Sequence, residues 1–202
     1  MTYWSATVAR MADMDRFTSA LDDWIPGRMA EYGATDSLGM QVVLGGEAAG
    51  TVQVAFEYPS VDAVLEANAK QAADPDFRQL LQDSGGQLLR RSLLKTWGER
   101  GERAGQYATG LYIAHDPLDQ ATADSNLDKS WTHMQAGATG IAQSLIIAGG
   151  EMTGVTIVVT RTDSMDSLLE ASAKNFADPE VQQSMAAINA RVVGRVVGRV
   201  LI

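Results

Sequence analysis

The hydrophobic pattern along this chain predicts strands and amphipathic helices in a regular order. Residues 3–10 are rich in aromatic and β-branched side chains, which is typical of a strand. Apolar residues then recur at three- and four-residue steps, as on one face of a helix, at Met14, Phe17, Leu21 and Trp24. The remaining elements predicted for the first half are strands at residues 40–44, 51–58 and 88–97 and helices that begin after Ser60 and Asp74.

The second half of the chain repeats this order. The elements predicted there are strands at residues 107–115, 144–148, 155–161 and 192–202 and helices that begin after Asp116-Pro117, Asp163 and Asp178. The stretches 45–75 and 149–179 align without a gap, so that every aligned pair lies 104 positions apart. An internal repeat of this kind indicates that one structural unit occurs twice.

Each half has the order strand, helix, strand, strand, helix, strand, which is the ferredoxin-like split β-α-β plan. Such a sheet carries helices on one face only, and the run 155–159 is apolar on both sides, so a second layer is needed. We therefore predict an α+β fold in which two tandem ferredoxin-like β-α-β-β-α-β units pack sheet to sheet as one pseudo-symmetric α/β barrel. The predicted units are residues 1–98 and 106–202, joined by a linker at residues 99–105.

The composition of the 202-residue chain disfavours several classes of function. A net charge of −9 and a pI of about 4.6 argue against binding to nucleic acids or to anionic membranes. The absence of cysteine excludes disulfides, thiol catalysis and cysteine-ligated metals. The first residues lack the basic and apolar regions of a signal peptide, and no apolar run is long enough for a membrane span. We therefore expect a cytoplasmic protein with neither a nucleic-acid nor a membrane partner.

The repeat also carries a resemblance to a known group of proteins. Both copies end their small-residue helix in Ala-Asp-Pro, at residues 73–75 and 177–179, before the last strand. On this arrangement the chain resembles the dimeric α/β-barrel superfamily, and within it the NIPSNAP-like and antibiotic-biosynthesis-monooxygenase-like branches. The resemblance implies that the fused pair closes within one chain the barrel that single-unit relatives form as dimers.

The resemblance covers nearly the whole chain but implies several kinds of chemistry. Members of the superfamily include cofactor-free oxygenases, haem-degrading oxygenases, isomerases and proteins without an assigned activity. The Asn, Trp and His set on which the haem-degrading relatives depend has no match in this sequence, and we expect no cofactor.

Histidine is the side chain that ordinarily changes charge near neutral pH, and the chain has two, His115 and His133. His115 ends a strand beside a helix start, where pockets commonly open, and is the candidate general base. Met11 stands at its equivalent position in the first half. The alternative is a histidine bonded locally in a loop. His133 follows Trp131 by two residues on a helix and is expected near the surface, and the sequence contains no metal-binding spacing such as HExxH.

Candidate ligand-binding residues are the aromatic residues Tyr107, Tyr112 and Trp131 and the arginines Arg195 and Arg199. The aromatic rings would shape a pocket, or they pack in the core. In a strand, Arg195 and Arg199 share one face, and we expect this face at the barrel seam, where it would hold an anionic ligand. The opposite face, which is small and apolar, is expected to pack under the helices. Exposure of both arginines at a strand edge is the alternative.

Two functions follow from these residues. The first is a small-molecule-binding α/β-barrel protein without an evident catalytic set, whose ligand is small and apolar or aromatic. The alternative is a cofactor-free monooxygenase- or isomerase-like enzyme that acts on such a molecule with His115 as base. A structural oligomer subunit is a third interpretation, and a homodimer formed through the helices or outer edges is compatible with all three.

Overall fold

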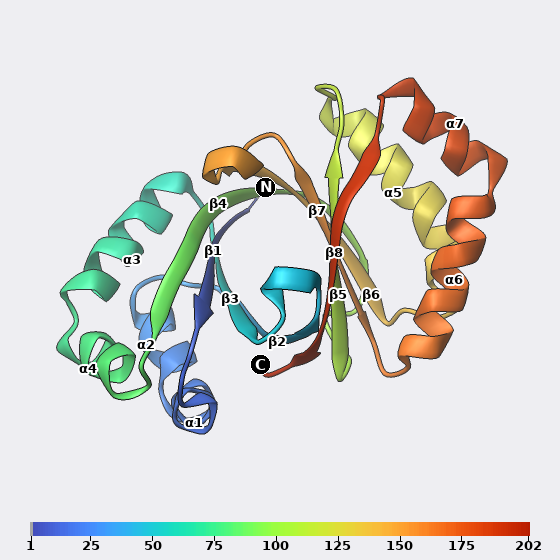
Figure 1. Cartoon of the computed structure of the whole chain (residues 1–202). Coiled ribbons are helices and arrows are strands. Elements are labelled where there is room, and N and C mark those ends of the chain that lie inside the picture. Colours follow the sequence, from blue (N-terminus) through green and yellow to red (C-terminus); the bar gives the residue numbers. More distant parts are fainter. Residues whose placement is uncertain (1) are drawn as a thin grey trace.

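The computed structural model describes residues 2–202 and shows a closed, antiparallel, eight-stranded barrel with seven α-helices on its outside (Figure 1). The first half supplies β1 (Tyr3–Arg10), α1 (Met14–Asp23), α2 (Ile25–Glu31), β2 (Asp36–Leu44), β3 (Thr51–Tyr58), α3 (Val61–Ala73), α4 (Pro75–Asp83) and β4 (Gln87–Gly101). The second half supplies β5 (Tyr107–Ala114), α5 (Gln120–Met134), β6 (Gly140–Ala148), β7 (Thr156–Thr162), α6 (Met165–Ala177), α7 (Pro179–Ala187) and β8 (Arg191–Val200). The predicted α+β barrel is confirmed.

The barrel closes where the strands of one half pair with those of the other. The order around it is β1-β3-β2-β8-β5-β7-β6-β4, so β2 pairs with β8 and β4 pairs with β6. Closure leaves no unpaired strand edge and buries the inner face of every strand. Figure 1 shows α1–α4 on one flank of the barrel and α5–α7 on the other. None of the helices within residues 2–202 is long and apolar enough to cross a membrane.

Local capping explains why the helices begin where the sequence predicts. The hydroxyl of Ser60 accepts a hydrogen bond from the Ala63 amide at the start of α3, and Ser164 caps α6 in the same way, one residue later than the start predicted after Asp163. Asp74 and Asp178 cap α4 and α7, each followed by a proline at the first helical position. Both caps therefore recur at the same offset along the chain.

The start of α5 corrects one prediction. The helix begins at Gln120, because Asp119 caps it by accepting a hydrogen bond from the Thr122 amide at 2.7 Å. Asp116 does not cap this helix, and its carboxylate instead accepts a hydrogen bond from the Asn189 side chain. The strand β4 also runs to Gly101, beyond its predicted end and into the predicted linker, because its last residues pair with β6.

The orientation of β8 corrects a second prediction. Val196 lies inside the barrel with Met40 and Tyr112, opposite Gly110 on β5, whereas Arg195 faces the helices. The small apolar face is therefore the inner one, and the arginine face lies outside, the reverse of the expected arrangement. The narrow interior of an eight-stranded barrel accepts small apolar side chains, and an unpaired guanidinium there would lose its hydration.

Candidate functional site

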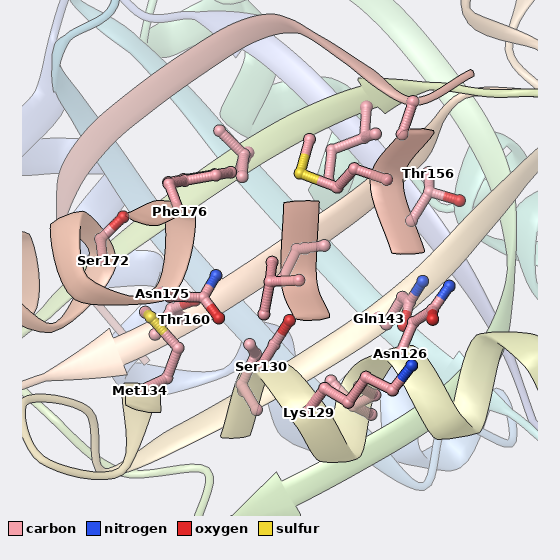
Figure 2. A pocket seen from close by; sticks show the side chains of 18 of the residues that line it. Asn126, Lys129, Ser130, Met134, Gln143, Thr156, Thr160, Ser172, Asn175 and Phe176 are labelled. Carbon is pink, nitrogen blue, oxygen red and sulfur yellow. The ribbon is translucent and has the colours of Figure 1, made fainter. Parts of the chain in front are cut away.

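A cavity of about 120 Å³ lies between the barrel and the helices of the second half (Figure 2). Its floor is the outer face of β5, β6 and β7, and its roof is formed by α5, α6 and α7. Most of its walls are apolar, with Leu111, Val158, Met134, Leu168, Phe176 and Met185 among the lining residues. A few polar side chains interrupt these walls, as is typical of small-molecule sites.

At three matching positions along the cavity the second half carries smaller side chains than the first. In the first half Phe56, which pairs with Ser5, packs with Phe77 and Leu80 between sheet and helices. The residues 104 positions later are Thr160, Val181 and Ser184, and all three line the cavity. Thr160 pairs with Thr109 in the same register, so the two positions are equivalent in space. Other lining positions change in the opposite direction, as where Ile141 and Phe176 correspond to Ser37 and Ala72, so the smaller residues open space only beside Thr160, Val181 and Ser184.

His115 lies at one part of this cavity and is held through both ring nitrogens. Its Nδ1 is 2.7 Å from the carbonyl oxygen of Asp116, and its Nε2 is 2.7 Å from Oγ1 of Thr156. A carbonyl oxygen only accepts, so Nδ1 carries a proton. In the tautomer that is protonated at Nδ1 alone, the Thr156 hydroxyl donates to the Nε2 lone pair. The ring of Trp97 packs at 5.8 Å from the imidazole centroid. This arrangement gives an oriented base that receives a proton directly or through Thr156.

The polar end of the cavity is formed by residues of α6 and β8. Asn175 is 7% exposed, points into the cavity, and its Oδ1 is buried without a hydrogen-bond donor (Figure 2). Nearby, Nη2 of Arg195 donates to Oγ of Ser172 at 3.1 Å, and its guanidinium lies 6.0 Å from the Phe176 ring centroid. On α5, Lys129 donates from Nζ to a serine of α7 at 2.8 Å. The cavity thus combines apolar walls, two cations and a buried acceptor, Asn175 Oδ1, that has no hydrogen-bond partner.

The other predicted site residues are not gathered here. Tyr112 lies inside the barrel and lines a second cavity of about 110 Å³. Trp131 packs against the apolar cluster under α5, and Arg199 is exposed on β8. Tyr107 pairs with β7 and β8 but lines neither of these two cavities. Of the six predicted residues, the structure brings only His115 and Arg195 to one cavity.

The second histidine is occupied elsewhere. Nε2 of His133 lies 3.2 Å from Oδ2 of Asp178, outside the cavity lining. The amide of Val181, and more weakly His133, hold the pKa of Asp178 below its ordinary value. Over residues 2–202 no three histidine, aspartate or glutamate side chains cluster as a metal site would require. The residues of the cavity also do not fit a haem, since its one imidazole, that of His115, is engaged through both nitrogens.

Sequence reasoning missed Thr156, Thr160 and Asn175. None belongs to a motif, and an asparagine or threonine among many others carries no distinct signal. The signal that was available is the difference between the two halves at the constant offset. Phe56 of the first half corresponds to Thr160 of the second, and Gln71 corresponds to Asn175. Such differences mark where one copy packs a core and the other opens a cavity.

No protein-family model matches the sequence, and no curated protein matches it either. Solved structures do match. A candidate monooxygenase from Fusobacterium nucleatum subsp. nucleatum shares 11% identity at a TM-score of 0.62, over 100% of this chain and 93% of that one. A mutant chlorite dismutase from Candidatus Nitrospira defluvii, in complex with cyanide, shares 9% identity at a TM-score of 0.60, over 98% and 90%. An anthrone oxidase-like protein shares 12% identity at a TM-score of 0.55, over 98% and 91%.

The chain shares the fold of these proteins over nearly its whole length. The likeness at such low identity concerns the fold alone. What the chain does must be argued from its own residues.

Proposed function

We propose that this protein binds a small apolar or aromatic molecule in the cavity of its second half. We propose further that it acts on this molecule as a cofactor-free monooxygenase- or isomerase-like enzyme. The observation that carries the proposal is the position of His115, whose Nε2 lies 2.7 Å from Oγ1 of Thr156 in the wall of a cavity that is apolar over most of its surface. The equivalent residue of the first half, Met11, is part of a packed core. The names of the solved neighbours, two of which are oxygen-handling enzymes by description, support this class.

The chemistry requires a substrate with an acidic C–H bond. His115 takes the proton on Nε2, and the electron pair stays on the substrate carbon. In the isomerase form the imidazolium returns the proton at another atom, and no further reactant is needed. In the monooxygenase form the electron pair goes to dioxygen, which is the oxidant. A CH₂ group then becomes a carbonyl that keeps one oxygen atom, and the other leaves as water with the two hydrogens.

The fold supports a finer description of the chain's plan. We infer that residues 1–98 and 106–202 are tandem ferredoxin-like units, joined by a linker that the end of β4 enters. The strand order gives β4-β1-β3-β2 in one half and β8-β5-β7-β6 in the other, and α3 and α6 are equally long at matching positions. In this plan one unit is packed for stability and the other is opened for binding. A homodimer stays a prediction.

Native mass spectrometry of freshly purified protein, followed by denaturation, tests for a bound small molecule. A defined probe is 3-cyclohexen-1-one, an uncharged six-membered ring with acidic C–H bonds, whose isomerisation to the conjugated enone is followed by absorbance and whose oxidation is followed by O₂ uptake. We expect His115→Gln to lower turnover by about 100-fold or more while ligand affinity stays within threefold. His133→Gln is the matched control and is expected to behave as the wild type. Wild-type turnover by His115→Gln, with this probe or with a co-purified compound, would exclude His115 as the base.

A non-catalytic carrier is the second candidate. It is favoured by one observation, that His115 has a backbone carbonyl and a threonine as hydrogen-bond partners and no carboxylate. A carrier would bind the recovered molecule with the same affinity in wild type and in His115→Gln, and neither protein would convert it.

A further inference from the structure

The free acceptor in the cavity is unusual for a folded protein. Within residues 2–202, three buried side-chain atoms lack a hydrogen-bond partner: Tyr58 Oη, Ser92 Oγ and Asn175 Oδ1. Tyr58 lies in the packed core of the first half, and Ser92 lines the cavity inside the barrel. Asn175 alone of these three lines the cavity that also contains His115. Buried polar groups are paired as a rule, and an exception at a cavity wall points to a partner from outside the chain.

The first half shows how the same position is satisfied when no cavity is present. There Oε1 of Gln71 accepts a hydrogen bond from Nη2 of Arg91 at 3.0 Å. The same guanidinium donates from Nε to Oγ1 of Thr7, on the neighbouring strand, at 3.2 Å. Helix and sheet are thus tied together by one arginine, and no acceptor is left over.

In the second half the equivalent arginine does not link the helix to the neighbouring strand in this way. The residues 104 positions later are Asn175, Arg195 and Leu111, and the register of Leu111 with Arg195 matches that of Thr7 with Arg91. Leu111 offers no acceptor, and Arg195 donates to Ser172 instead. Asn175 is one methylene shorter than glutamine, and its amide stays among the apolar walls. The amide oxygen of Gln71 is therefore hydrogen-bonded in the first half, whereas the equivalent oxygen of Asn175 has no partner in the second.

The volume and walls of the cavity define what reaches this acceptor. An apolar cavity of roughly 150 Å³ is known to bind benzene, and this cavity, at about 120 Å³, is somewhat smaller, so its ligand is no larger than about one six-membered ring. The walls include the aromatic ring of Phe176 and the thioether of Met134 beside the aliphatic Leu168. These surfaces suit a flat ring better than a flexible chain. The group that meets Oδ1 must be a donor, since an amide oxygen only accepts.

We propose that Asn175 is the specificity-determining residue of this site and that it accepts a hydrogen bond from the hydroxyl of a single-ring phenol. The inference rests on the proposed function only in taking the cavity as a ligand site, and it does not depend on His115 being a base. A site with a buried polar group discriminates strongly against an isostere that leaves this group unpaired.

The isosteric pair p-cresol and p-xylene tests the assignment, because the two differ by a hydroxyl in place of a methyl group. We expect the wild type, measured by calorimetric titration, to bind p-cresol at least tenfold more tightly than p-xylene. Asn175→Leu and Asn175→Ala are expected to lose this preference, with p-xylene binding at least as well as in the wild type. Gln71→Leu, the matched change in the first half, is expected to keep it. Circular dichroism confirms that each variant is folded.

The outcomes separate this inference from the proposed function. A variant at Asn175 that keeps the wild-type preference for p-cresol would overturn the inference, and so would a wild type that binds both compounds equally. Either result leaves the cavity as a ligand site. Failure of both compounds to bind the wild type would refute the cavity as a site for single-ring ligands, and with it both proposals.

Discussion

Filling the cavity with the side chain that the first half uses should stabilise the protein and abolish binding. In Thr160→Phe the new ring occupies the position that Phe56 holds in the packed half, where Phe56 is 6% exposed. Cavities cost about 24 cal/mol per Å³, so complete filling of about 120 Å³ would contribute about 3 kcal/mol. One phenylalanine ring fills only part of this space. We therefore expect a gain of about 1–2 kcal/mol in the free energy of unfolding.

Urea unfolding followed by circular dichroism measures this gain as a higher midpoint at an unchanged m-value. For a chain of this size the same gain raises the Tm by about 5 °C. Thr160→Val is the matched control, because it removes the hydroxyl without filling the cavity, and it should change stability by less than about 1 kcal/mol. Calorimetry should show no binding of p-cresol to Thr160→Phe.

Two results would refute this reasoning. Destabilisation of Thr160→Phe by more than about 1 kcal/mol would show that the second half cannot accept the packing of the first. Stabilisation with unchanged affinity for p-cresol would show that the ligand does not occupy this cavity.

Three further predictions follow from buried polar groups. In the ligand-free protein, Asn175→Leu should raise the free energy of unfolding by about 1 kcal/mol, because an unpaired acceptor is removed. A lower urea midpoint than in the wild type, measured without ligand, would contradict this. Arg103→Ala should lower the free energy of unfolding by about 3 kcal/mol, because Glu57, whose side chain is 8% exposed, loses its ion pair at 2.8 Å. The double variant Arg103→Ala, Glu57→Gln should recover at least half of this loss in the same assay. The Tyr32 hydroxyl, and more weakly Arg28, hold the pKa of Asp74 below its ordinary value, so this carboxylate contributes stability above about pH 4 that is lost as the pH falls through its lowered pKa. Asp74→Asn keeps a capping oxygen but cannot titrate, so its stability should fall less than that of the wild type as the pH is lowered below about 4. Equal slopes of the urea midpoint against pH for the wild type and the variant would disprove this.

The sequence by itself determined the order of the elements, the caps of α3, α4 and α7 and the closed α+β barrel. These features depend on short-range patterns. Ser60 and Asp74 cap helices through amides two or three residues away, and the two-sided apolar strand at residues 155–159 requires cover on both faces. The constant offset between the halves indicated that the helix caps and strands predicted for one half recur at matching positions in the other. His115 was identified because histidine is rare here and lies at a strand end.

Only the tertiary structure decided which face of β8 lies inside, where α5 begins, and which residues meet in a cavity. Alternation along β8 separates Arg195 from Val196 but does not say which of the two faces the barrel interior. The cavity depends on the summed side-chain volumes of four strands and three helices, and no local pattern records such a sum. Asn175 is free because Arg195, Ser172 and Leu111 converge from other elements and leave it without a donor. A missing partner is a property of the assembled neighbourhood, which exists only after the chain has folded.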